Sequence, residues 1–153
     1  MSLTTALIDQ LRGDLDLYGR TVLKIRDKDA TLRPLRMNVA QKLVHQRISD
    51  QRRNTGRVRA VILKARQEGV STYTAARFFR GMHLWQGRKP MVIADSLERA
   101  GVLFDIYQRY LQNVPSEIAP SGKAIAERKR MAFAHDSELS VRPASDTEAG
   151  RAQ

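Results

Sequence analysis

The residues with the clearest chemical potential form a short loop, residues 64–72, between an apolar run and the start of a helix. The loop holds two cationic side chains, Lys64 and Arg66, a glycine at Gly69 and a hydroxyl at Ser71. Backbone N–H groups at a strand-to-helix turn and the positive end of the helix dipole favour a bound anion. A hydroxyl in the first helical turn can ligate Mg²⁺, and a nearby Lys or Arg can reach the β- and γ-phosphates of a nucleotide. The stretch is therefore a candidate nucleotide loop.

The loop departs from the usual phosphate-binding pattern, Gly-x-x-x-x-Gly-Lys-Ser/Thr. When the pattern is aligned on Gly69 and Ser71, this chain has Lys64 in place of the first glycine and Val70 in place of the lysine. The cationic role then falls to Lys64 or to Arg66, and the residues leave open which is the main phosphate ligand. An ordinary strand-to-helix turn with solvated charges explains the same residues about equally well.

Composition favours a globular protein with a polyanionic partner. The 153 residues suit one domain with a sizeable core, and the net charge of +11 favours nucleic acid or nucleotide as the partner. The absence of Cys excludes a disulfide framework, and the three scattered His form no ligand-spaced pair. No apolar run approaches the roughly 18 residues of a membrane span, and the N-terminus does not match a signal peptide. We therefore expect an intracellular protein without a membrane partner.

Periodicity and helix-breaking residues predict the elements around the loop. In chain order we expect a helix over 2–18 ended by Gly19, a hairpin of strands 21–25 and 30–35, a helix over 38–51, a basic loop over 52–57, a strand over 58–63, a helix over 70–85, a strand over 90–94, a helix from Ser96 to Pro115, a loop over 116–129, and a hairpin of strands 130–134 and 138–142. Residues 57–94 then form a βαβ unit with a right-handed crossover. Ligands bind beyond the carboxyl ends of the strands in such sheets, which is where the candidate loop lies.

Residues 64–72 resemble the deviant Walker A motif of tailed-phage terminase large subunits, the ATPases that package viral DNA. That family often carries an Arg-Gln-x-Gly core, here Arg66 to Gly69, and some members move the lysine to the start of the loop, as Lys64 does. Three further segments are similar to parts of the family: residues 35–41 to the adenine-recognition segment, residues 92–100 and 107–115 to the strand and helix after the Walker A strand, and residues 141–151 to the segment before the Walker B strand. The resemblance covers most of residues 20–153.

The resemblance implies an α/β fold, a P-loop NTPase of the ASCE type with a parallel sheet flanked by helices and incomplete at its C-terminal end. Residues 1–56 would be the N-terminal helix, hairpin and adenine-recognition region. Residues 57–153 would be the ATPase core, truncated before the Walker B strand, with the family's nuclease domain absent. The implied function is the ATP-binding part of a motor that couples ATP hydrolysis to DNA translocation into a procapsid, although this segment alone would hydrolyse ATP very poorly.

The resemblance also implies surroundings and cofactors. The implied cofactors are ATP and Mg²⁺, with Mg²⁺ bridging the β- and γ-oxygens of the transferring phosphoryl group. The implied partners are double-stranded DNA, a small terminase subunit and a portal protein. The full motor would be a homo-oligomeric ring in the host cytoplasm.

Individual residues acquire roles from the resemblance. Gln41 would hydrogen-bond the adenine edge, Lys64 would neutralise phosphate charge, and Arg66 would approach the γ-phosphate. Arg151 matches a position from which family members offer an arginine to a neighbouring subunit, and Ser71 would ligate Mg²⁺. The implied catalytic residues are Lys64, Arg66 and Arg151. The implied ATP-binding set is Gln41, Lys64, Ala65, Arg66, Gln67, Glu68, Gly69, Val70, Ser71 and Thr72.

Two other functions are compatible with the residues. A helicase-like P-loop translocase shares an upstream Gln and a similar strand order, but it normally keeps the Gly-Lys-Thr sequence that Val70 breaks here. A basic DNA-binding module without a nucleotide site would contact phosphates through Arg52, Arg53, Arg57 and Arg59. The DNA-binding module predicts salt-sensitive DNA affinity and no dependence on ATP.

Overall fold

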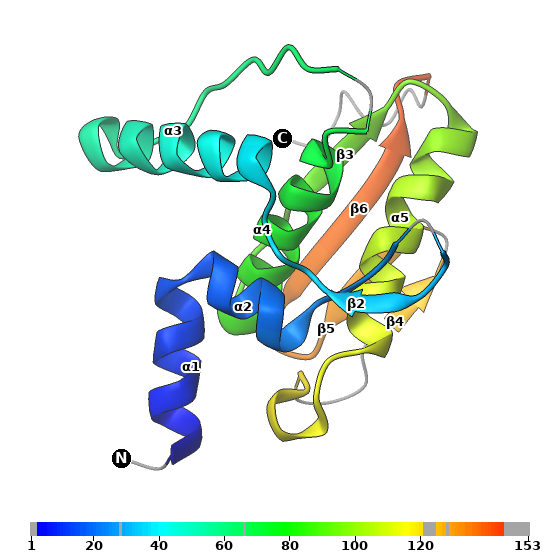
Figure 1. Cartoon of the computed structure of the whole chain (residues 1–153). Helices are drawn as coiled ribbons and strands as arrows, with labels where there is room; N and C mark the ends of the chain where they lie inside the picture. Colours follow the sequence, from blue (N-terminus) through cyan, green and yellow to red (C-terminus); the bar gives the residue numbers. More distant parts are fainter. Residues whose placement is uncertain (1–2, 28, 66, 121–124, 128, 146–153) are drawn as a thin grey trace.

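The computed structural model describes residues 3–27, 29–65, 67–120, 125–127 and 129–145, and within them the chain is a mixed α/β protein (Figure 1). The elements, in chain order, are α1 (Leu3–Gly13), α2 (Leu15–Val22), β1 (Lys24–Arg26), β2 (Leu32–Pro34), α3 (Val39–Thr55), α4 (Val70–Leu84), β3 (Met91–Ala94), α5 (Leu97–Gln112), the 3₁₀ helix η1 (Ser116–Ile118), β4 (Ile125–Glu127), β5 (Arg130–Phe133) and β6 (Ser137–Pro143). None of the described helices combines the length and the apolar character that a membrane crossing requires.

The larger sheet has the strand order β3-β6-β5-β4. β3 pairs with β6 in parallel, with Val92 opposite Val141, whereas the β6–β5 and β5–β4 pairs are antiparallel. α4 and α5 both pack against β6, the strand that Figure 1 shows between them. β1 and β2 form a separate antiparallel hairpin, as predicted, although its first strand begins at Lys24 because Thr21 and Val22 belong to α2. The sheet is therefore mixed, with one parallel pair, β3–β6, in place of the predicted parallel pairing of residues 58–63 with residues 90–94.

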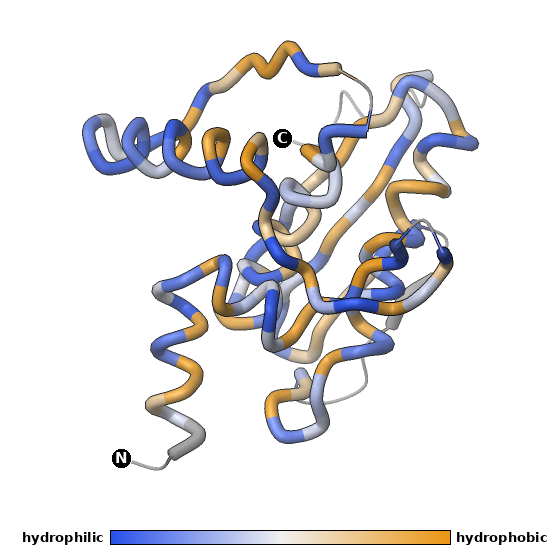
Figure 2. The backbone as a smooth tube through the Cα atoms, in the orientation of Figure 1, coloured by the Kyte–Doolittle hydropathy of each residue, from blue (hydrophilic) through white to orange (hydrophobic). Residues whose placement is uncertain are grey.

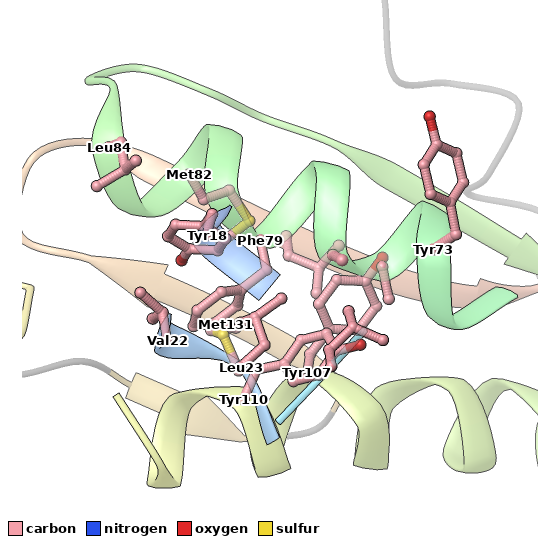
Figure 3. Close-up of a cluster of buried hydrophobic side chains, with 14 of the residues drawn as sticks. Tyr18, Val22, Leu23, Tyr73, Phe79, Met82, Leu84, Tyr107, Tyr110 and Met131 are labelled. Carbon is pink, nitrogen blue, oxygen red and sulfur yellow. The ribbon is translucent and has the colours of Figure 1, made fainter. Parts of the chain in front are cut away.

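The core lies where α4, α5 and the strands meet, and aromatic side chains dominate it (Figure 3). The ring of Phe79 on α4 lies edge-to-face with Tyr110 on α5 and with Phe133 on β5, at centroid separations of 5.6 and 6.0 Å. Tyr18 from α2 is fully buried in the same cluster. α4 buries the face that carries Tyr73, Ala76 and Phe79 in this core, whereas Ser71 in its first turn is exposed. The predicted helix over 70–85 is confirmed.

A buried histidine joins three elements of the core. The Tyr18 hydroxyl lies 2.7 Å from Nδ1 of His83, and Nε2 of His83 lies 2.6 Å from the carbonyl oxygen of Ile118. Because a carbonyl can only accept, Nε2 carries the proton and Nδ1 accepts from Tyr18. Burial is the main cause that lowers the pKa of His83, so the neutral ring is favoured.

The N-terminal segment differs from its prediction, because two helices replace the single helix expected over 2–18. The side-chain oxygen of Asp14 accepts from the backbone N–H groups of Asp16 and Leu17 at 2.8 and 3.0 Å, and therefore caps a new helix at Leu15. Gly19 lies inside α2 and does not end it.

Two loop predictions were also wrong in extent. α3 continues beyond Gln51 to Thr55, so that Arg52 and Arg53 belong to its last turn, where basic side chains suit the helix dipole. The helix ends at Gly56, which adopts the left-handed conformation with φ of +73°. The stretch 116–129, expected to be a loop, contains η1 and β4.

The largest difference concerns residues 58–63, which were predicted to be the first strand of a βαβ unit and form no strand. Val61 and Leu63 are fully exposed, and Figure 2 shows this apolar segment as an orange stretch that runs apart from the sheet. The backbone N–H and C=O of Arg59 bond to the side chain of Gln51, at 2.9 and 3.0 Å, instead of to a neighbouring strand. An apolar run favours extended backbone, but a strand also requires a partner for its backbone groups.

Candidate functional site

The predicted loop meets the first turn of α3 in the structure. Gln41 is 4% exposed, and its side-chain Nε2 donates to the carbonyl oxygen of Gly69 at 2.8 Å. Beside it, Nδ2 of Asn38 donates to the carbonyl oxygen of Glu68 at 3.3 Å. Two segments that the sequence separates by a whole helix therefore lie in direct contact.

A capping box at the start of α3 holds Gln41 in this position. The Asn38 side-chain oxygen accepts from the backbone N–H of Gln41 at 2.8 Å, and Oε1 of Gln41 accepts from the backbone N–H of Asn38 at 3.0 Å. The predicted N-cap at Asn38 is thus confirmed. Among the described residues these bonds use one N–H and one oxygen lone pair of the Gln41 amide, which leaves one of each for a further partner.

Gly69 is the residue that allows the close approach of Gln41. Its φ of +69° lies in the left-handed region, and a Cβ there would lie 2.6 Å from Nε2 of Gln41. Gly69 is also the N-cap of α4, and it provides no side-chain hydrogen bond to the helix. The first backbone N–H groups of α4 therefore remain available, and the helix dipole makes this end favourable for an anion.

The first turn of α4 is fixed by the core on one side. The buried hydroxyl of Tyr110 donates to the carbonyl oxygen of Thr72 at 3.2 Å. Burial raises the pKa of Tyr110, so the hydroxyl keeps its proton for this bond. Val70 is buried, while Ser71 is exposed in the same turn. The helix start is therefore anchored through Thr72, while Ser71 in the same turn is exposed.

Ser71 opens onto a cavity of about 480 Å³ that lies between the start of α4, the carboxyl end of β3 and the N-terminal half of α5. The cavity is also lined by Ala94, the last residue of β3, and by Asp95 and Arg99, whose side chains pair at 3.4 Å. Ligands of α/β sheets bind at this end of the strands. Asp95 and Arg99 were not among the predicted site residues, although the position of Asp95 directly after an apolar run could have indicated it.

The remaining predicted site residues do not gather at the start of α4. Lys64 and Ala65 lie on the exposed segment, and Nζ of Lys64 donates to the neighbouring carbonyl of Ala65 at 3.3 Å rather than to a group across the loop. Gln67 is exposed and adopts a left-handed φ of +65° in the turn before Gly69. Arg66 and Arg151 lie outside the described residues.

The Ser71 hydroxyl is the one predicted protein ligand for Mg²⁺, so the other ligands of the ion would have to come from a bound nucleotide and water. Within the described residues, no group of three or more His, Asp or Glu is arranged to hold a metal ion. Mg²⁺ keeps several water ligands and is commonly bound through substrate phosphates with few protein oxygens. A single hydroxyl at the start of a helix is therefore compatible with Mg²⁺ that arrives with ATP, and not with a metal site made by the protein alone.

No model of a known protein family matches the chain, and no curated protein matches it significantly. A function for the chain therefore has to be inferred from its residues and their geometry.

Proposed function

We propose that the chain is the ATP-binding part of a viral DNA-packaging motor of the terminase large-subunit type, with a P-loop fold of the ASCE class. The observation that carries this proposal is the hydrogen bond from Gln41 to Gly69. The resemblance assigns Gln41 to adenine and Gly69 to the phosphate loop, and these two residues are brought together at the start of α4.

In the proposed site the triphosphate lies at the N-terminus of α4. The free N–H groups of the first turn receive phosphate oxygens, and the Ser71 hydroxyl ligates Mg²⁺. Lys64 and Arg66 neutralise the negative charge, which requires the segment over 57–65 to move toward the helix start. The adenine edge bonds to the remaining N–H and lone pair of Gln41. Catalysis would be positioning plus electrostatic stabilisation of the transferring phosphoryl group.

The proposal extends to the surroundings of the motor. It places the protein in the host cytoplasm with double-stranded DNA, a small terminase subunit and a portal protein as partners, and with further copies in a ring. It includes slow ATP turnover by this chain alone and nuclease activity in the full-length protein.

Calorimetric titration of the chain with Mg-ATP and with a non-hydrolysable analogue tests the nucleotide site. Lys64→Ala, Arg66→Ala and Ser71→Ala are compared with Arg26→Ala, which removes an exposed arginine on the β1–β2 hairpin. A charged hydrogen bond contributes about 1.5–3 kcal/mol, so we expect the loss of a main phosphate ligand to weaken binding about 10- to 100-fold. Arg26→Ala should leave binding unchanged.

The relative losses of Lys64→Ala and Arg66→Ala identify the main phosphate ligand. Absence of measurable binding by a sample whose circular dichroism shows it to be folded would refute the nucleotide proposal. The basic DNA-binding module would then be the remaining function.

A further inference from the structure

A second cavity, of about 350 Å³, lies between α3 and the C-terminal half of α4. Four arginines line it, Arg52, Arg77, Arg80 and Arg88, together with the ring of Trp85, and none of its lining residues is acidic. At a rise of 1.5 Å per residue, the part of α4 that lines this cavity begins roughly 10 Å along the helix from the first turn, where the candidate nucleotide loop lies. The two sites are therefore separate.

The four cavity arginines are only weakly neutralised: the charge of Asp14 raises the pKa of Arg80, but burial and the charge of Arg77 have larger effects and lower it. In the described part of the chain none of them forms an ion pair, although other arginines, such as Arg53 with Asp50, do. Nη1 of Arg77 donates to the Tyr73 hydroxyl at 3.3 Å, and the buried Nε of Arg80 has no hydrogen-bond partner. Arg77 and Arg80 are partly buried, and like charges in that setting without an ion-pair partner are unfavourable, so an anion in the cavity would stabilise them.

The positive potential of the cluster extends to neighbouring groups. Burial lowers the pKa of Arg80, and the charge of Arg77 lowers it further. The pKa of His45, on the face of α3 near α4, is likewise lowered by burial and then by Arg77 and Arg80. Asp14 and Asp16 act in the opposite direction at His45 but contribute less than the arginines.

The shape of the basic surface favours an extended anion. Beyond the cavity, the end of α3 and the following segment carry three more exposed arginines, Arg53, Arg57 and Arg59. A small anion could use the cavity alone, whereas a nucleic acid presents phosphates at regular intervals along such a surface. Guanidinium groups match phosphate oxygens in a planar, two-pronged geometry that lysines do not provide.

Trp85 supports the arginines instead of offering a surface for a base. The guanidinium groups of Arg12 and Arg80 lie over its ring, at 5.8 and 5.7 Å from the centroid. Cation–π contacts of this kind hold a guanidinium in place. We propose that the cavity lined by Arg52, Arg77, Arg80 and Arg88, together with the exposed arginines that follow α3, binds the phosphate backbone of a nucleic acid without reading its sequence. This proposal does not depend on the nucleotide site.

Fluorescence anisotropy with a labelled DNA duplex of arbitrary sequence, and with the matching single strand, tests this surface across a range of salt concentrations. The double variant Arg52→Gln/Arg88→Gln removes two exposed cavity arginines for which the structure gives no side-chain hydrogen bond. The matched control, Arg26→Gln/Arg36→Gln, removes the same charge from exposed positions at and after the β1–β2 hairpin. Circular dichroism establishes that both variants remain folded.

Each lost phosphate contact lowers the slope of log affinity against log salt by about 0.9 on a duplex, so the cavity variant should lose about 2 in slope and about 10- to 100-fold in affinity near 0.1 M salt. The control should lose less than about threefold, because it changes only the overall charge. Equal losses in the two variants, or no binding by the wild type, would overturn the proposal. Displacement of the DNA by low-millimolar inorganic phosphate would also overturn it, since the cavity would then be a small-anion site.

Discussion

Two apolar runs that look alike in the sequence behave differently in the structure. Residues 58–63 and residues 90–94 both predict a strand, but only the second becomes one, as β3. β3 has a partner in β6, and backbone bonds at both ends extend the pairing, from Ser140 N–H to Pro90 at 3.2 Å and from Ala144 N–H to Ala94 at 2.7 Å. The run over 58–63 has no such partner in the described chain. An apolar run therefore favours extended backbone, but it forms a β-strand only where a neighbouring strand pairs with its backbone groups.

A matched pair of leucines should show the largest difference between the paired and unpaired regions. Leu139 on β6 is fully buried and Leu63 is fully exposed. We expect Leu139→Ala to lower the free energy of unfolding by about 2–5 kcal/mol, because it leaves a cavity in the core. Leu63→Ala should change it by less than about 0.5 kcal/mol. Urea unfolding followed by circular dichroism measures both, and a large loss in Leu63→Ala would mean that residues 58–63 are packed in solution.

A pair of glycines tests the contact between Gln41 and Gly69, which lies at the C-terminal end of the loop that follows residues 58–63. Gly69 and Gly87 share a φ of +69°, but a Cβ at Gly87 would meet no atom within 4 Å. Gly87→Ala should therefore cost about 1–2 kcal/mol, the penalty of a left-handed alanine. Gly69→Ala should cost about 1–3 kcal/mol more, because its Cβ overlaps with Nε2 of Gln41.

The same unfolding measurement separates the two contributions at Gly69. Combining Gly69→Ala with Gln41→Ala removes the overlap, so the double variant should recover part of the unfolding free energy that Gly69→Ala loses through it. Equal losses for Gly69→Ala and Gly87→Ala would show that Gln41 does not press against the loop.

The pH dependence of stability should distinguish the core from the unpaired run. The pKa of His83 is lowered by burial, so the unfolded chain binds this proton first as the pH falls. The neutral His83 ring therefore contributes its full stabilisation at pH values above the ordinary histidine pKa of about 6.5. This contribution decreases as the pH falls from about 6.5 toward the lower pKa of His83 in the folded protein. Unfolding measured between pH 8 and pH 5 should show this loss, and His83→Gln should reduce the slope. An unchanged slope in that variant would contradict the assignment.

Limited proteolysis should distinguish the unpaired segment from the paired strands, and cleavage in the unpaired segment should have little effect on stability. Trypsin should cut first at Arg57, Arg59 or Lys64, because this backbone is exposed and unpaired, and later at Arg130, which lies in β5. The nicked chain should stay in one piece on gel filtration, since α1 and α2 share their core with α4 and α5. Early cleavage at Arg130 would mean that β5 is more accessible to the protease than the unpaired segment over 57–64, which contradicts the prediction.

Much of the fold could be predicted because its signals are local. Asn38 and Ser96 cap the helices they were expected to cap, and α4 and the hairpin of β5 and β6 appear close to their predicted positions. Asp14 was missed because a capping residue was read as one polar position within a longer helical pattern. For the candidate site, the sequence supplied the loop and Gln41, whereas Asp95 and Arg99 became visible only through the cavity they line.

The sequence by itself determined the helix starts capped by Asn38 and Ser96, the apolar face of each helix and the excess of positive charge, because each of these can be read from residues that are neighbours along the chain. Tertiary structure alone decided the contact of Gln41 with Gly69, the pairing of β3 with β6, the exposed run over 58–63 and the cavity of four arginines. These features join residues far apart in the sequence, and they depend on which backbone groups and charges find partners after the chain has folded.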